Sequence, residues 1–215
     1  KNEETFIQKV KQVNSSEILK FFNKKLFSEK YWSISYKPDN KITYNDALEE
    51  IKYLVEKSVQ RTLISDVPLS IMLSGGIDSA VILGIAKKKF NKNFKSFSII
   101  DNDLRYNETK NIELTRKFTK NQNIKLRLAG KSKNNFFKLK DLIEYHSKPV
   151  ITISSFLSSL LANKISKNKI KVNLSGVGAD EIFSGYYDHT LFYLNQIKNE
   201  KFFHKNFLYW KKNYK

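Results

Sequence analysis

The feature that most constrains this chain is a glycine-containing loop, Leu73 to Ser79, between a segment patterned like a strand and one patterned like a helix. Residues 67–73 are apolar enough for a buried strand, and residues 80–86 have the apolar density of a helix packed on a sheet. Gly75 and Gly76 lack a Cβ, so the backbone could approach a ligand and turn its N–H groups toward it, while the start of the helix adds partial positive charge. The loop therefore predicts a site for the anionic oxygens of a pyrophosphate group.

The carboxylate of Asp78 narrows the chemistry of this loop. Phosphate oxygens would repel a bare carboxylate, and a bridging Mg²⁺ removes that conflict because Mg²⁺ is commonly held by one or two carboxylates together with substrate phosphates. The loop lacks the Gly-Lys-Ser/Thr ending of a Walker loop, so it differs from the phosphate loops of that class. The alternative is a glycine turn without a ligand, which any α/β domain can contain.

A second motif of the same kind follows about one hundred residues later. The apolar segment 170–174 reads as a short strand, and Ser175 and Gly176 open a Ser-Gly-x-Gly turn that leads to Asp180 and Glu181. Taken alone, the acidic pair is a favourable first-turn charge on a helix. At the carboxyl end of a second parallel strand, however, Asp180 would share a crevice with Asp78, and the two carboxylates could hold Mg²⁺ from opposite sides.

The remaining pattern alternates between strands and helices. A helix is expected from Tyr44 to Leu63, with one apolar stripe and a capping box formed by Thr43 and Asp46. Further strands are expected at 94–100 and 124–128, and further helices at 108–118, 136–145 and 153–165. This alternation predicts an α/β fold with a doubly wound parallel sheet.

The formal charge of +18 requires that nucleic-acid binding be considered. Only four of the 39 basic residues are arginines, the residue expected at bidentate phosphate or base contacts. The lysines are scattered, which favours a solvated surface over a nucleic-acid interface. No apolar run approaches membrane-spanning length and no leader sequence is recognisable, so we expect a soluble, cytoplasmic protein. The absence of cysteine excludes disulfides and thiolate metal sites.

Together the two motifs resemble the synthetase domain of the asparagine synthetases. The resemblance covers Asp66 to Ser79 and Leu174 to Tyr186, and it extends over nearly the whole chain. It implies the fold of the adenine-nucleotide alpha-hydrolases, the PP-loop ATP pyrophosphatases, which split ATP between its α and β phosphates. It also implies a ligase that converts aspartate to β-aspartyl-AMP with release of pyrophosphate, and then transfers ammonia to give asparagine.

The resemblance also implies a set of site residues. Asp78 and Asp180 would be catalytic and would hold Mg²⁺, while ATP would be bound by both loops and one strand end. The nucleotide would contact Leu73, Ile99, Ser175 and Gly176. Its pyrophosphate would contact Ser74, Gly75, Gly76 and Ser79. The implied partners are ATP, aspartate or a related carboxylate, ammonia, and a glutaminase domain in cis or in trans.

The chain departs from the family at several points. Val177 stands where the family has an acidic residue, and Asn107 stands where an Asp-Glu pair is common, although Glu108 matches. A helix start with ordinary capping would explain Asn107 equally well. No cysteine is present for a glutaminase, and the chain ends soon after the second motif, without the downstream Lys- and Arg-rich segment that the family uses to steady the phosphate charge. We therefore expect residues 1–38 to be the end of a glutaminase domain with its linker, and residues 39–215 to be an incomplete synthetase domain, impaired in isolation.

Two alternatives remain at this stage. One is a tRNA-modifying adenylating enzyme of the same superfamily, and the other is an ATP-binding remnant that no longer catalyses. The second motif, ending in Gly185 and Tyr186, argues against the tRNA lysidine synthetases, which lack it. The missing cysteine argues against the tRNA thiolation enzymes, which need a reactive thiol.

Overall fold

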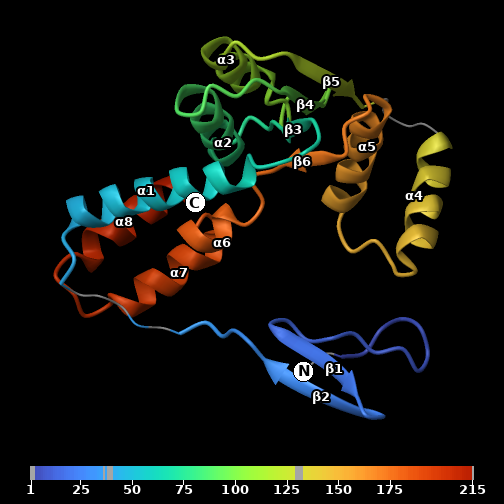
Figure 1. Ribbon diagram of the computed structural model, residues 1–215. Helices are drawn as coiled ribbons and strands as arrows, with labels where there is room; N and C mark the ends of the chain where they lie inside the picture. The colour runs from blue at the N-terminus through green and yellow to red at the C-terminus, as the bar shows by residue number, and fades with distance from the viewer. Residues whose placement is uncertain (1–2, 36, 38–40, 129–132, 215) are drawn as a thin grey trace. The chain divides into compact units, whose positions relative to one another are not determined.

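The computed structural model (Figure 1) describes residues 3–35, 37, 41–128 and 133–214. The chain divides into two compact units. Unit 1 comprises Lys1–Lys57 and Ala129–Asn163, and unit 2 comprises Ser58–Leu128 and Lys164–Lys215. The domain boundary expected at residues 38 and 39 falls outside the described residues and stays a prediction. Both glycine loops belong to unit 2, so the candidate site can be built within that unit.

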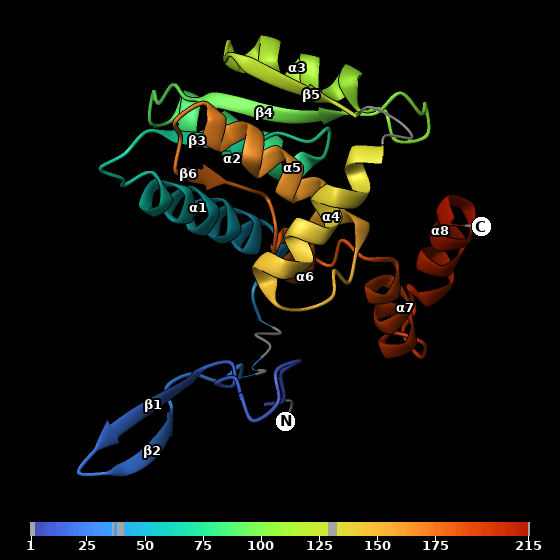
Figure 2. The same ribbon diagram turned by 90° about the vertical axis from the view of Figure 1, so that its right-hand side faces the viewer.

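A four-stranded parallel sheet forms the centre of unit 2, in the order β5-β4-β3-β6 (Figure 2). Its strands are β3 (Leu69–Met72), β4 (Lys95–Ile100), β5 (Asn123–Arg127) and β6 (Val172–Leu174). The chain passes from β3 outward to β4 and β5, and β6 then pairs with the opposite side of β3. The winding direction therefore reverses between β3 and β6, and in open parallel sheets ligands bind at the carboxyl ends of the strands at such a point.

Two crossover helices cover one face of this sheet. α2 (Ile77–Lys88) connects β3 to β4, α3 (Thr109–Thr119) connects β4 to β5, and the two helices lie against each other. The buried cluster beneath them consists of Ile71, Leu73, Leu83, Ile100 and Ile112. Because side chains alternate along a strand, Ile71 and Leu73 both point into this cluster. The predicted α/β fold with a parallel sheet is confirmed.

The central strand is shorter than the predicted 67–73. It begins at Leu69, directly after Pro68, because proline has no backbone N–H to donate to the ladder. α2 begins at Ile77, three residues before the apolar stretch from which it was predicted, because Gly76 is extended (φ −77°, ψ 159°) and acts as the N-cap. The loop between strand and helix is thus only four residues long, from Leu73 to Gly76.

A polar network crosses the sheet just below the first loop. The Ser98 hydroxyl donates to the carbonyl oxygen of Leu73 over 2.6 Å, and the Asn123 amide donates to the hydroxyls of Ser98 and Ser96 over 2.8 Å each. Ser96 and Ser98 are fully buried. Buried polar groups need such partners, so this network fixes the end of β3 relative to β4 and β5.

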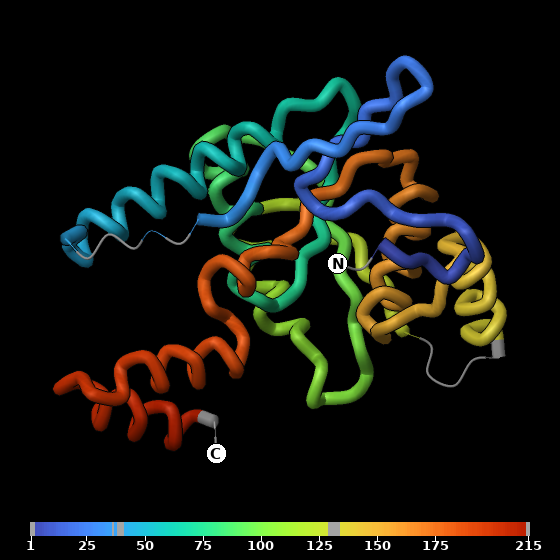
Figure 3. The backbone as a smooth tube through the Cα atoms, turned by 90° about the horizontal axis from the view of Figure 1, so that it is seen from below, coloured from blue at the N-terminus to red at the C-terminus, as the bar shows by residue number. Residues whose placement is uncertain are grey.

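The C-terminal part of unit 2 consists of three helices, α6 (Ala179–Phe183), α7 (Tyr187–Gln196) and α8 (Phe203–Tyr214). Figure 3 shows α7 and α8 side by side. Their contact includes an aromatic pair, since the ring of Trp210 in α8 lies 5.8 Å from the ring of Tyr187 in α7 between centroids. Within α8, Phe207 stacks on the same Trp210 ring at 5.9 Å. α6 opens this part and carries the acidic pair of the second motif.

Unit 1 contains an antiparallel hairpin of β1 (Glu17–Phe22) and β2 (Lys25–Lys30), together with α4 (Lys133–His146) and most of α1 (Tyr44–Thr62) and α5 (Ile153–Lys167). Asn23 and Lys24 have φ values of 49° and 61°, the two-residue turn that suits the twist of a hairpin. The predicted capping interaction is present, because the Thr43 hydroxyl accepts from Asp46 N over 3.2 Å and donates to its carboxylate over 2.6 Å.

Candidate active site

The first loop starts from a residue that is anchored in the core. Leu73 is 1% exposed, its N–H donates to the Phe97 carbonyl over 2.8 Å, and its own carbonyl accepts from Ser98. Both its side chain and its backbone polar groups are therefore engaged within the protein. Leu73 supports the loop from below, and the nucleotide contact that the family resemblance implies for it stays a prediction.

Two serines join the beginning and the end of this loop. Ser79 is 3% exposed, and its Oγ accepts from Ser74 N over 3.1 Å and lies 3.0 Å from Ser74 Oγ. Gly76 N in turn donates to Ser74 Oγ over 3.2 Å. The Ser79 hydroxyl therefore closes the loop from inside, whereas Ser74 is exposed and is the serine of this pair that faces solvent.

Gly75 meets the start of the neighbouring helix. Its N–H donates to Glu108 Oε2 over 3.0 Å. A Cβ on Gly75 would lie 2.5 Å from Glu108 Cβ and 3.2 Å from Asn111 Cβ, so the missing side chain makes room for the first turn of α3. The sequence predicts that the backbone at Gly75 can approach a ligand, and the structure places Glu108 and Asn111 beside it. The pyrophosphate contact that the family resemblance implies for Gly75 stays a prediction. Asn107 does have the ordinary capping role, because its side chain accepts from Thr109 N over 3.0 Å.

The second loop lies directly on the first turn of α2. A Cβ on Gly176 would lie 2.7 Å from Asp78 Cβ and 3.0 Å from Ser79 N. Residues about one hundred positions apart are thus in van der Waals contact at the carboxyl ends of β3 and β6. Asp180 follows within α6, where a Cβ on Gly185 would run into its carboxylate. The structure brings the two predicted motifs together.

The acidic residue next to Asp180 has its own hydrogen bond. The Tyr186 hydroxyl donates to Glu181 Oε1 over 2.8 Å. This bond lowers the pKa of Glu181 below its usual value, with smaller contributions from backbone N–H groups and from His189, and it raises the pKa of Tyr186. The sequence singled out Glu181 and Tyr186 as motif residues without predicting that they pair. Their spacing of five residues across a glycine turn is the signal that could have suggested it.

Each of the two motifs offers carboxylate oxygen atoms of the kind that suits a hard cation. Asp78 and Asp180 are both half-buried, and Ser74 and Ser175 present exposed hydroxyls nearby in sequence. No group of three or more acidic, histidine or cysteine side chains able to hold a metal occurs among the described residues. These residues fit Mg²⁺ in the form in which proteins usually hold it, by one or two carboxylates with substrate phosphates completing the coordination.

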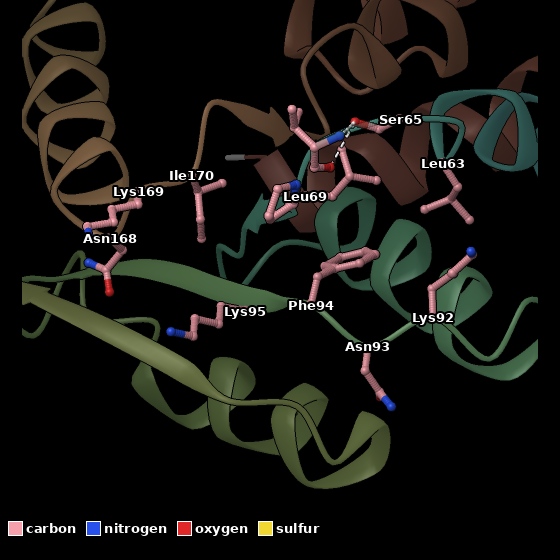
Figure 4. Close-up of a pocket in the computed structure, with 12 residues that line it drawn as sticks. Leu63, Ser65, Leu69, Lys92, Asn93, Phe94, Lys95, Asn168, Lys169 and Ile170 are labelled. Atoms are coloured by element: carbon pink, nitrogen blue, oxygen red, sulfur yellow. Dashed lines mark hydrogen bonds between the residues drawn. The ribbon is translucent and has the colours of Figure 1, made fainter.

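A separate cavity of about 550 Å³ lies at the opposite edge of the sheet (Figure 4). It is lined by residues that precede or begin strands, among them Leu69, Phe94 and Ile170, together with Lys92 and Lys169. Because the strands are parallel, this is the amino edge, away from both loops. The cavity contains none of the predicted site residues, and the chemistry of those residues makes the carboxyl edge the candidate site.

The parallel sheet with a Ser-Gly-Gly-x-Asp-Ser loop at its carboxyl edge defines an α/β protein of the PP-loop type. The family model for asparagine synthase matches residues 50–211, and the chain belongs to that family. Among relatives, asparagine synthetase (glutamine-hydrolyzing) 1 of Bacillus subtilis is 31% identical over 157 residues, and asparagine synthetase (glutamine-hydrolyzing) 3 of the same organism is 28% identical over 190 residues. Asparagine synthetase (glutamine-hydrolyzing) 1 of Arabidopsis thaliana is 27% identical over 210 residues.

These matches cover 73%, 82% and 86% of this chain, respectively, but only 24%, 30% and 32% of the relatives. The chain thus spans about a third of their length or less. Among solved structures, an NH3-dependent NAD synthetase from Campylobacter jejuni has 16% sequence identity and a TM-score of 0.40, covering 67% of this chain and 61% of that chain. Within the described ranges, no helix is both long enough and apolar enough to cross a membrane.

Proposed function

We propose that unit 2 binds Mg-ATP at the carboxyl edge of its sheet, with the pyrophosphate portion over Ser74 to Ser79 and Asp78 and Asp180 on Mg²⁺. The observation that carries this proposal is the close approach of Gly176 to Asp78, which joins the two motifs into one site. Residues 77–79 of this segment form the first turn of α2, and the N–H groups of a helix's first turn attract anions. When bound, Mg²⁺ would offset the charge of the phosphates beside these two carboxylates.

We further propose that the activity is that of a carbon–nitrogen ligase of asparagine biosynthesis. An oxygen of the aspartate side-chain carboxylate attacks the α-phosphorus of ATP, the bond from that phosphorus to the bridging oxygen breaks, and pyrophosphate leaves. Ammonia then attacks the acyl carbon, AMP leaves with the electrons of the broken carbon–oxygen bond, and the nitrogen releases a proton to give the amide. The nucleotide would lie over Ile99, Ser175 and Gly176, with Leu73 beneath them. Ammonia would come from a glutaminase domain. The protein would act in the cytoplasm on small-molecule substrates and would not bind nucleic acid.

A second candidate function, nucleotide binding without turnover, is favoured by Val177. Its side chain is 89% exposed, so no apolar contact in the described part of unit 2 explains a valine at this position. Valine can neither accept a proton nor interact with a cation beside an acyl-adenylate. Positioned electrostatic groups contribute roughly 3 to 4 kcal/mol to transition-state stabilisation, or about two to three orders of magnitude in rate. We therefore expect this chain to synthesise little asparagine from ATP, aspartate and ammonia.

Titration calorimetry with Mg-ATP tests the binding site. We expect Asp78→Asn to weaken binding at least tenfold without changing the thermal unfolding temperature, because the carboxylate acts on the metal. Lys110→Ala, an exposed substitution on α3, is the control for a change of charge. Equal affinity of the parent chain and Asp78→Asn would disprove the metal assignment.

Analysis of the products from α-labelled ATP tests the reaction. We expect any turnover to release pyrophosphate and AMP, and accumulation of ADP would contradict the proposed chemistry. Val177→Glu separates the two candidate functions, because the exposed position can accommodate the larger side chain. A gain in ammonia-dependent asparagine synthesis would support a ligase whose missing carboxylate limits it. If both forms bind Mg-ATP and neither turns over, the binding function is favoured.

A further inference from the structure

Glu108 makes a contact that its position at a helix start does not require. Helix-start residues commonly bond the N–H groups of their own helix. Here Asn107 does this by accepting from Thr109 N, whereas the Glu108 side chain makes no capping bond to α3. Glu108 instead reaches across to the first glycine loop and accepts from Gly75 N over 3.0 Å.

The loop is shaped around this side chain. A Cβ on Gly75 would lie 2.5 Å from Glu108 Cβ and 3.2 Å from its carboxyl carbon, so both ends of the Glu108 side chain lie beside Gly75, although Glu108 is exposed to solvent. Gly76 N and Ser74 N are satisfied by the hydroxyls of Ser74 and Ser79. Among the described residues, therefore, Glu108 is the only acceptor outside the segment Leu73 to Ser79 for the N–H groups of Ser74, Gly75 and Gly76.

The charge of Glu108 has a consequence for where a polyphosphate can bind. A carboxylate on Gly75 N repels a phosphate group from that N–H. The N–H groups at the start of α2 carry the positive end of the helix dipole and lie on the other side of Gly76. Within the segment Ser74 to Ser79, phosphate oxygens are thus directed toward the backbone N–H groups of residues 77–79 and away from Gly75 N.

We propose that Glu108 is a positioning residue of the nucleotide site, which holds Gly75 and so aims the phosphate-binding half of the loop at the ligand. This inference rests on the proposed binding of Mg-ATP. Glu108 acts through the loop backbone and not on the reacting atoms. Its own helix is held independently, because Glu113 of α3 pairs with Lys125 of β5 over 2.6 Å. Removing the Glu108 side chain should therefore loosen the loop and leave α3 in place.

The test compares Glu108→Ala with Glu108→Gln, whose amide oxygen can still accept the Gly75 N–H but carries no charge. Amide hydrogen exchange of the ligand-free protein is measured over residues 73–79, and Mg-ATP affinity is measured by calorimetry. We expect Glu108→Ala to speed exchange at Gly75 and to weaken Mg-ATP binding, each about tenfold, as for an N–H group left without its acceptor. Glu108→Gln should restore both, and Lys110→Ala on the same helix turn should change neither.

Several outcomes overturn the inference. Unchanged exchange at Gly75 in Glu108→Ala would mean that the contact does not hold the loop. Tighter Mg-ATP binding by Glu108→Ala would mean that the carboxylate competes with phosphate, and a defect in Glu108→Gln equal to that in Glu108→Ala would mean that the acceptor is not what matters. If the parent chain does not bind Mg-ATP, the proposed function fails, while the exchange measurement on the ligand-free protein still decides whether Glu108 holds the loop.

Discussion

The two glycine loops lie at the same edge of one sheet, but they are stabilised in different ways. In the first loop, Ser74 and Ser79 satisfy backbone N–H groups, and neither glycine has a positive φ. In the second loop, Gly178 has a φ of 101°, and Val177 is almost fully exposed. The first loop therefore depends on side-chain hydrogen bonds, and the second depends on backbone conformations that glycine permits.

The point where the loops meet should be the most sensitive to substitution. We expect Gly176→Ala to destabilise unit 2 by about 3 kcal/mol, because the added methyl group would lie 2.7 Å from Asp78 Cβ and 3.0 Å from the backbone of Ser79. Mg-ATP binding should be lost with it. Chemical denaturation measures the first effect. Gly84→Ala is the matched control, since a Cβ there has nothing within 4 Å and α2 should gain up to about 1 kcal/mol.

The difference in hydrogen bonding can be tested with one serine from each loop. Ser79→Ala should cost about 2 kcal/mol of unfolding free energy, because it leaves Ser74 N without the acceptor on which it depends. Ser175 is exposed, so Ser175→Ala should change stability by less than about 0.5 kcal/mol. Equal effects of the two substitutions would remove the distinction between the loops.

The reliance of the second loop on backbone conformation predicts a smaller effect. Gly178→Ala adds no steric contact, since nothing lies within 4 Å of the new Cβ, but it forces a left-handed conformation on an alanine. We expect a loss of about 1 to 2 kcal/mol, measured by denaturation. Gly178→Asn should lose less, because asparagine tolerates this region better than alanine. If alanine and asparagine behave alike, φ is not the constraint.

The smallest effect is expected at the hydrogen bond that follows the second loop. Tyr186→Phe removes the donor that lowers the pKa of Glu181, so this pKa should rise toward its usual value, as a carboxyl titration by NMR would detect. Because the folded-state pKa of Glu181 is lowered, its contribution to stability is present above the usual carboxyl pKa and is lost as the pH falls through the lowered value. Tyr186→Phe should weaken that acid dependence. An unchanged Glu181 titration would show that the backbone N–H groups dominate.

The sequence predicted the arrangement of the fold well because the relevant signals are local. Apolar runs identified the four strands of the sheet, and glycine turns follow two of them. The start of β3 is shifted by Pro68, and the start of α2 is shifted by Gly76. The capping interaction of Thr43 with Asp46 was predictable for the same reason, since both partners lie within one helical turn. The α7–α8 pair was not predicted, because the contact between Tyr187 and Trp210 forms only when the chain folds back on itself.

For the candidate site, the sequence by itself determined which residue types are available. The sequence shows directly the two glycine turns with their serines and the carboxylates of Asp78 and Asp180. It also shows Val177 at a position where the family has an acidic residue. Only the tertiary structure decided which glycine serves which purpose. Gly75 makes room for Glu108, Gly176 makes room for Asp78, and Gly178 supplies a left-handed turn. The contacts of Gly75 with Glu108 and of Gly176 with Asp78 depend on strand order, which brings distant loops to one edge of the sheet. No local sequence pattern encodes the distance between two residues that meet only when the sheet forms.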